Sequence, residues 1–231
     1  MAKKSNSGKI IAIALFVVVA AAAFFGYSRQ SSEMTKTAQE VNGEMANEGL
    51  GILTPKPSDI IMGDANALIT IVEYSSLSCT HCAHFHKEVL PTLDKDLIAT
   101  GKIRLVLRHF PLNEPALRAA ALVECAGANG GQRSNFMKVL FDMQAQWAFN
   151  ENFLKELQKI ALVGGVDSAA FESCMADKEL EARLLTGRQE AAEKLGVNST
   201  PSFFINGTKF EGDVSVDGFT KAISEAAPPK K

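Results

Sequence analysis

Two cysteines separated by two residues stand where a predicted strand leads into a predicted helix, and no other feature constrains the fold as strongly. Residues 67–74 are rich in apolar and β-branched side chains, which is typical of a buried strand. Over residues 82–100, apolar side chains recur at spacings of four, which indicates one face of a helix. The sequence therefore predicts that Cys79 lies at the start of this helix and Cys82 one turn into it.

This position favours redox chemistry for the cysteine pair. The free N–H groups and the positive dipole end of a helix start stabilise a thiolate, so we expect a lowered pKa for Cys79. His81, when protonated, would add positive charge beside the same sulfur. Cys82 can attack a mixed disulfide on Cys79 and release the bound partner. We therefore predict that Cys79 and Cys82 form a redox-active disulfide.

Other uses of a C-x-x-C pair fit this sequence less well. A zinc ribbon needs two such pairs, and the chain has one. A metal site made of both cysteines with His84 or His86 would be strained within one short helical stretch. Haem attachment requires a histidine where Ala83 stands, and a structural disulfide across so small a loop stabilises little. We expect no metal and no other cofactor.

The N-terminal segment differs from the rest of the chain. Lys3, Lys4 and Lys9 precede an apolar run without charges at residues 10–27. Such a run indicates a membrane anchor or a cleaved signal peptide, and the lysines favour a cytoplasmic N-terminus with an exported body. We favour the anchor, because apolar residues continue past the small residues that would form a cleavage site. The remainder is mildly acidic and has no basic stripe, so we expect no nucleic-acid partner.

The other predicted elements alternate between strand and helix. Residues 103–110 form a second strand, parallel to the first because a helix connects the two. Residues 114–195 carry only helical signals, and Met62 to Asn66 form a turn. The remaining elements are a hairpin of strands 202–205 and 208–211 around Asn206-Gly207, and a final helix at 218–226 capped by Asp217.

With these elements in place, the chain resembles the thioredoxin superfamily, and more narrowly the DsbA-like thiol–disulfide oxidoreductases of the bacterial cell envelope. The likeness is dense over residues 73–112, which include Cys79-Thr80-His81-Cys82, and it resumes over 196–203. It implies an α/β, thioredoxin-like fold with an inserted helical domain. The implied organisation is an anchor or signal at 1–27, a polar tether at 28–57, a first thioredoxin-like part at 58–112, a helical insert at 113–195 and a second thioredoxin-like part at 196–228.

The resemblance also implies roles for individual residues. Cys79 is expected to be the exposed nucleophile and Cys82 the buried resolving cysteine. Glu73 matches the buried acid that exchanges a proton with the resolving cysteine, and the alternative is an exposed carboxylate on a strand. Thr200 and Pro201 match the loop that faces the disulfide, where the proline is cis and the backbone of Thr200 pairs with an extended substrate.

The function implied by the resemblance is the oxidation of cysteine pairs in exported proteins. This places the body in the bacterial periplasm, held at the inner membrane through residues 10–27, with a membrane partner that reoxidises the cysteines. His81 is shared with the oxidising members of the family, whereas Thr80 replaces their usual proline and leaves the redox potential open. The alternatives are a disulfide isomerase or reductase with the same site, or a tethered chaperone or metal carrier that uses Cys79, Cys82 and His84.

Two further cysteines, Cys125 and Cys174, lie in the predicted helical insert. Leftover cysteines of an exported chain usually pair, so we expect a structural disulfide, and the alternative is two buried free thiols. We expect His84, His86 and His109 to be ordinary surface or packed residues.

Overall fold

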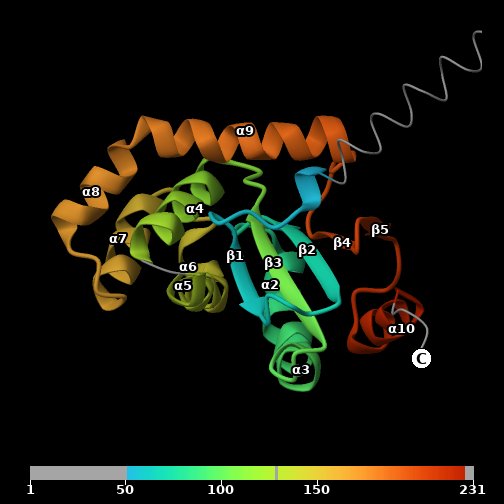
Figure 1. Ribbon diagram of the computed structural model, residues 1–231. Coiled ribbons are helices and arrows are strands. Elements are labelled where there is room, and N and C mark those ends of the chain that lie inside the picture. Colours follow the sequence, from blue (N-terminus) through green and yellow to red (C-terminus); the bar gives the residue numbers. More distant parts are fainter. Residues whose placement is uncertain (1–50, 128–129, 227–231) are drawn as a thin grey trace, which may run out of the picture. The chain divides into compact units, whose positions relative to one another are not determined.

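A five-stranded mixed sheet lies at the centre of the computed structural model, which describes residues 51–127 and 130–226 (Figure 1). The strand order is β1-β3-β2-β4-β5, with β2 and β3 parallel and the other neighbours antiparallel. The strands are β1 (Ile60–Gly63), β2 (Ile69–Ser75), β3 (Ile103–His109), β4 (Ser202–Ile205) and β5 (Thr208–Phe210). The parallel pairing of the first two predicted strands is confirmed.

The apolar run at 10–27, which we expect to be an anchor or a signal, lies outside the described residues, as does the tether up to residue 50. Within the part of the chain that the structure describes, none of the helices has the length and apolar character needed to cross a membrane.

The two faces of β2 are buried in two separate cores. Ile71 belongs to the core that contains the helix after Cys79. Val72 and Tyr74 belong to the other core, together with Ala191 of α9 (Lys178–Leu195). Successive side chains of a strand point to opposite faces, so a strand covered on both sides carries an almost continuous apolar sequence. This explains why residues 67–74 resemble a buried strand in sequence.

The helix after Cys79 runs without a break from residue 80 to residue 98 but contains two widened turns. Its parts are α2 (Thr80–His84), a π-helical turn (Phe85–Val89), α3 (Leu90–Leu93) and a second π-helical turn (Asp94–Ile98). At the end of the first widened turn, the N–H of Leu90 donates to the carbonyl of Phe85, five residues earlier. Pro91, which has no N–H, follows directly. The first widened turn therefore ends directly before a proline that cannot donate a backbone hydrogen bond.

The helical insert connects β3 to β4 and shares a core with the sheet. Its helices are α4 (Glu114–Ala126), α5 (Gly130–Asp142), α6 (Gln144–Trp147), α7 (Phe153–Val163), α8 (Ser168–Ala176) and α9. Figure 1 shows α4, α5, α7 and α8 gathered beyond the β1 edge of the sheet and α9 crossing one end of it. Leu122 of α4 and Trp147 of α6 belong to the same apolar cluster as Phe85 of the cysteine helix. The insert is therefore packed against the element that carries the cysteines.

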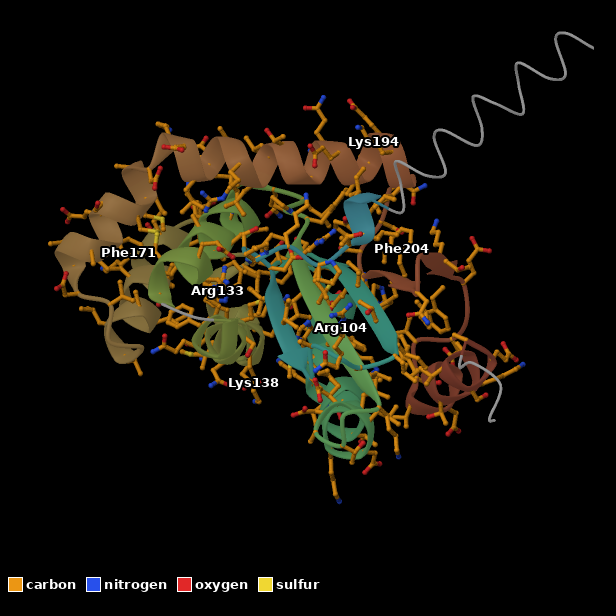
Figure 2. All side chains as sticks on the ribbon, viewed as in Figure 1. Arg104, Arg133, Lys138, Phe171, Lys194 and Phe204 are labelled. Atoms are coloured by element: carbon orange, nitrogen blue, oxygen red, sulfur yellow. A yellow bond between two sulfur atoms is a disulfide. The ribbon has the colours of Figure 1, made fainter. Side chains whose placement is uncertain are left out.

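A partly buried charged cluster fastens the insert to the edge of the sheet. Arg133 of α5, labelled in Figure 2, donates to Glu124 of α4 at 2.6 Å and to the carbonyl of Ser58 at 3.0 Å. Glu124 also lies 3.3 Å from the Nε2 of His109 at the end of β3. His109 is therefore a packed residue, as expected, and it joins α4 to the sheet.

Two local predictions are right in kind but misplaced. The turn predicted over residues 62–66 begins later, since Met62 and Gly63 belong to β1, which pairs with β3, and the turn itself is closed by the N–H of Ala67 donating to the carbonyl of Asp64 at 3.1 Å. The backbone turns at Gly63, whose φ of 98° suits glycine and whose added Cβ would lie 2.8 Å from the carbonyl oxygen of Ile103. The glycine therefore ends a short edge strand.

The final helix, α10 (Val216–Ala226), begins earlier than predicted. Its N–H groups are capped by Ser215, whose Oγ accepts a hydrogen bond from the N–H of Gly218 at 3.1 Å. Asp217 lies within the first turn of α10 and is not the cap. A negative charge there still favours the helix, because the N-terminal end of the dipole is positive.

Candidate active site

Cys79 lies at the end of the β2–α2 loop and begins the helix. Its backbone is extended, with φ −81° and ψ 125°, and its carbonyl accepts the first helical hydrogen bond, from the N–H of Ala83 at 3.0 Å. Its own N–H donates to the carbonyl of Ser76 at 3.0 Å. Both cysteines of the pair are thiols in this structure; Cys79 is half-buried, whereas Cys82 is 0% exposed.

The surroundings of Cys79 favour its thiolate. A hydrogen bond from the Cys82 side chain is the largest influence and lowers the pKa of Cys79 to about 5, against the opposing effect of burial. Thr200 and the backbone N–H groups of Cys82 and His81 lower this pKa further. His81 thus lowers the pKa of Cys79 through its backbone N–H, whereas the sequence led us to expect an effect of its side-chain charge. Cys79 has the character of a nucleophile at neutral pH.

The surroundings of Cys82 have the opposite effect. Burial is the largest influence and raises the pKa of the Cys82 thiol above its ordinary value. The hydrogen bond with Cys79 and the negative charge of Glu73 raise it further, whereas Ser75 acts in the other direction. Cys82 is therefore held as a neutral thiol that can donate to the neighbouring thiolate.

Glu73 is buried beneath the cysteines and is paired with a histidine. Its carboxylate is 0% exposed, and its two oxygens lie 3.0 Å and 3.2 Å from the Nε2 of His86. The ring of His86 stacks on Phe141 of α5 with centroids 4.2 Å apart. The alternative of an exposed strand carboxylate does not describe Glu73, and His86 is not merely packed, since it holds this carboxylate. His86 lies one turn after Cys82, a spacing that places both on one helix face.

Gln144 of α6 joins the helical insert to the redox loop. Its side chain is 5% exposed, and its amide donates to the carbonyl of Leu77 at 2.7 Å and to the carbonyl of Cys79 at 2.9 Å. Residues 77 and 144 are far apart in the chain, and no sequence pattern connects them. Gln144 fixes the peptide that carries the nucleophile.

Thr200 and Pro201 lie against Cys79. The peptide bond between them is cis, and the Sγ of Cys79 is 3.3 Å from the carbonyl oxygen of Thr200. The loop that precedes β4 is thus brought to the cysteine from a distant part of the chain. Its backbone borders the sulfur that a substrate would approach.

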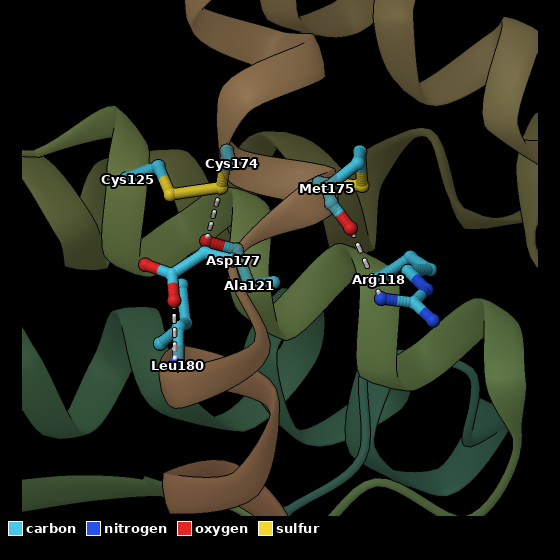
Figure 3. Close-up of a disulfide and its surroundings, with 7 residues drawn as sticks. All are labelled: Arg118, Ala121, Cys125, Cys174, Met175, Asp177 and Leu180. Atoms are coloured by element: carbon cyan, nitrogen blue, oxygen red, sulfur yellow. Dashed lines mark hydrogen bonds between the residues drawn. A yellow bond between two sulfur atoms is a disulfide. The ribbon is translucent and has the colours of Figure 1, made fainter.

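The other two cysteines, Cys125 and Cys174, form a disulfide within the helical insert. In sequence, both are far from Cys79 and Cys82. The Cα atoms of Cys125 and Cys174 are 6.1 Å apart, and the bond joins α4 to α8 (Figure 3). Arg118 of α4 adds a hydrogen bond to the carbonyl of Met175 at 3.3 Å. Asp177 caps α9 by accepting from the N–H of Leu180 at 2.9 Å, so covalent and polar contacts meet at the α8–α9 corner.

Over residues 51–127 and 130–226, no three His, Cys, Asp or Glu side chains approach closely enough to hold a metal ion. The sequence-based metal alternative would combine Cys82 with His84, which is exposed on the surface of the helix while Cys82 is buried.

Comparison with known proteins places this arrangement in a family. The family described as Thioredoxin matches residues 55–225. Two curated relatives, protein-disulfide oxidoreductases by name from Rickettsia prowazekii and Rickettsia felis, are 31% and 30% identical over 73% and 75% of this chain. The chain spans about three fifths of their length, at 61% and 62%.

A solved structure resembles the chain over most of its own length. The α-DsbA1 protein of Wolbachia pipientis superposes with a TM-score of 0.72 and is 33% identical, covering 77% of this chain and 95% of the Wolbachia chain. The sheet order, the helical insert and the cysteine loop thus agree with the sequence resemblance. The chain belongs to the thioredoxin superfamily and, within it, to the DsbA-like thiol–disulfide oxidoreductases.

Proposed function

We propose that this protein oxidises pairs of cysteines in exported proteins through a disulfide between Cys79 and Cys82. The observation that carries this proposal is the opposite tuning of the two sulfurs, since the pKa of Cys79 is lowered to about 5 whereas that of Cys82 is raised. A half-exposed thiolate beside a buried neutral thiol can form and break a mixed disulfide in a fixed order.

The reaction runs in two exchange steps. A substrate thiolate attacks the Sγ of Cys79, the Cys79–Cys82 bond breaks, and its electron pair goes to the Sγ of Cys82, which takes up a proton. The second substrate thiolate then attacks the substrate sulfur of the mixed disulfide and releases Cys79 as a thiolate. The substrate leaves with a disulfide, and the protein keeps two electrons and one proton. Glu73, buried beside Cys82, is the proposed donor of that proton.

The low pKa of Cys79 favours an oxidase over an isomerase or reductase. Whatever stabilises the thiolate stabilises the reduced protein relative to the disulfide. The disulfide is then the less stable partner and tends to pass to a substrate. The carbonyl oxygen of Thr200 lies 3.3 Å from the Sγ of Cys79, where the backbone of an extended substrate peptide can pair with this loop.

The proposal includes a cellular arrangement. Residues 1–27 would anchor the protein in the inner membrane, residues 28–57 would form a tether, and the two thioredoxin-like parts (58–112 and 196–228) with the insert (113–195) would work in the periplasm. A membrane partner would accept electrons from Cys79 and Cys82. The support for this arrangement is the lysine-flanked apolar run at 10–27 and the disulfide in the insert, a type of bond that persists in oxidising compartments.

The test is the oxidation of a reduced peptide with two cysteines by the pre-oxidised protein. We expect one peptide disulfide per protein disulfide, and no oxidation by Cys79→Ser or Cys82→Ala, because neither variant can form the Cys79–Cys82 disulfide. The measured potential should be more oxidising than that of glutathione. Oxidation by Cys79→Ser at the wild-type rate, or a potential well below that of glutathione, would contradict the proposal.

A further inference from the structure

Four buried residues lie between the cysteine helix and β2 as two pairs, one pair above the other: Ser75 with Cys82, and Glu73 with His86. Cys82 and His86 are one turn apart on the helix, and Ser75 and Glu73 are alternate residues on the same face of the strand. Ser75 acts on Cys82, and Glu73 contacts His86. The pair formed by Glu73 and His86 therefore lies one level below the resolving sulfur.

Water does not reach this pair. Glu73 is 0% exposed and His86 is 4% exposed. Phe141 of α5 covers the imidazole face at 4.2 Å, and Phe85 packs against it edge-on at 5.4 Å. Among the described residues that contact His86 here, Glu73 from β2 is the titratable one, and Phe85 and Phe141 are uncharged. Cys82 lies one turn before His86 on the same helix.

The hydrogen bond between Glu73 and His86 can be made both with and without one added proton. With one added proton, the pair is either a carboxylic acid with a neutral imidazole or a carboxylate with an imidazolium, and the net charge is zero in both cases. Without it, a neutral imidazole can still donate its Nε2–H to the carboxylate, which lies 3.0 Å away. Imidazole exchanges protons readily near neutral pH, which the lysine or arginine of an ordinary buried ion pair does not.

We propose that Glu73 and His86 together hold one proton while Cys79 and Cys82 are joined, and deliver it to Cys82 when the disulfide is reduced. The inference rests on the thiol–disulfide exchange proposed above and assigns His86 a part in it. When the S–S bond breaks, Cys82 Sγ receives the electron pair and takes the proton from Glu73. The carboxylate that remains accepts the hydrogen bond of neutral His86. Reoxidation of the cysteines returns the proton to the pair.

This arrangement predicts how many protons the protein exchanges with water. Above pH 6, Cys79 remains a thiolate after reduction because its pKa is about 5, so Cys82 alone binds a proton. If that proton came from water, the two-electron potential would fall by about 30 mV per pH unit, the value for one tenfold change in proton concentration. If the pair supplies it, the protein takes up no net proton. The potential then changes little with pH.

The experiment measures the potential of the Cys79–Cys82 couple against glutathione between pH 6 and pH 8. We expect the wild-type protein to show less than half of the 30 mV slope per pH unit expected for one-proton uptake. His86→Gln keeps a hydrogen-bond donor but has no transferable proton, and Glu73→Gln removes the acid. Both variants should show the full slope. The matched control is His84→Gln, which alters an exposed histidine on the same helix and should keep the wild-type slope.

The outcomes separate this inference from the proposed function. A reversible wild-type couple with the full slope, or a His86→Gln slope equal to that of the wild type, would overturn the role of the pair and leave the oxidase intact. If His86→Gln does not fold, the wild-type slope decides alone. A Cys79–Cys82 pair that fails to equilibrate with glutathione would overturn both.

Discussion

One neighbour lowers the pKa of Cys79 more than any other group does. The side chain of Cys82 is the largest influence that lowers the pKa of Cys79 to about 5, ahead of Thr200 and the helix-start N–H groups. Alkylation of reduced Cys79 by iodoacetamide should therefore rise with pH through a midpoint near 5, because only the thiolate reacts. Cys82, which is buried and protonated, should remain unlabelled in the folded protein.

The variants of Cys82 test this cause directly. Cys82→Ala removes the donor, so the alkylation midpoint of Cys79 should move upward, whereas Cys82→Ser keeps a donor and should lie closer to the wild-type value. The measurement is the initial alkylation rate from pH 3 to pH 9, followed by mass spectrometry. An unchanged midpoint in Cys82→Ala would show that Thr200 and the helix start lower this pKa without the Cys82 side chain.

At this scale, the sequence predicts residues whose chemistry is local and misses those whose partners are distant. Cys79 and Cys82 could be assigned because a strand, a helix start and two sulfurs follow one another in the chain. Glu73 could be proposed only through the resemblance, and its partner His86 looked like a packed residue. The spacing of four between Cys82 and His86 indicated a shared helix face, but the sequence alone did not say what that face meets.

At the scale of elements, the short helix α6 acts as a brace for the redox loop. Gln144 donates to the carbonyls of Leu77 and Cys79, and its burial leaves no water to replace it. Gln144→Leu should leave the Leu77 carbonyl without this donor and cost about 1–3 kcal/mol of unfolding free energy. It should also slow the oxidation of the test peptide, since the nucleophile is less well fixed.

The matched control for α6 is Gln146→Leu, which changes the same residue type at an exposed position of the same helix. It should shift the unfolding free energy by no more than about 0.5 kcal/mol. Urea unfolding of the reduced proteins measures both effects. Equal stability and equal peptide oxidation in the two variants would show that the Gln144 hydrogen bonds do not support the loop.

Elements were predictable where a periodic pattern was long enough. The two parallel strands and the hairpin around Asn206 follow their patterns closely. The positive φ of 46° at Asn206 and 88° at Gly207 suits the two-residue turn. The four residues of β1 were too few to outweigh the turn signal of Gly63 and Asp64. The strand forms because β3 offers it a free edge, which is information from the tertiary structure.

At the scale of the whole molecule, two kinds of link stabilise the helical insert. A disulfide connects its helices α4 and α8, and a shared apolar core packs the insert against the sheet. The disulfide between Cys125 and Cys174 closes a separation of 49 residues. Arg118 adds contacts across the same junction, to Met175 and, at 3.0 Å, to Glu181 of α9. The sequence predicted the pairing of the cysteines from their number, but it gave no indication of these polar contacts. The fold of the insert therefore depends on one covalent and several weaker links.

Removing the disulfide should lower stability without altering the redox centre. In the chain-entropy account, a loop of this length contributes about 4 kcal/mol, so Cys125→Ala/Cys174→Ala should lose up to that amount in urea unfolding, or less where Arg118 still holds the junction. The alkylation midpoint of Cys79 should stay near 5, because the groups that lower its pKa are Cys82, Thr200 and the backbone N–H groups of the helix start. Arg118→Met in the double variant should lower stability further. If instead the double variant kept wild-type stability but shifted the Cys79 midpoint, the disulfide would act on the redox centre through α4.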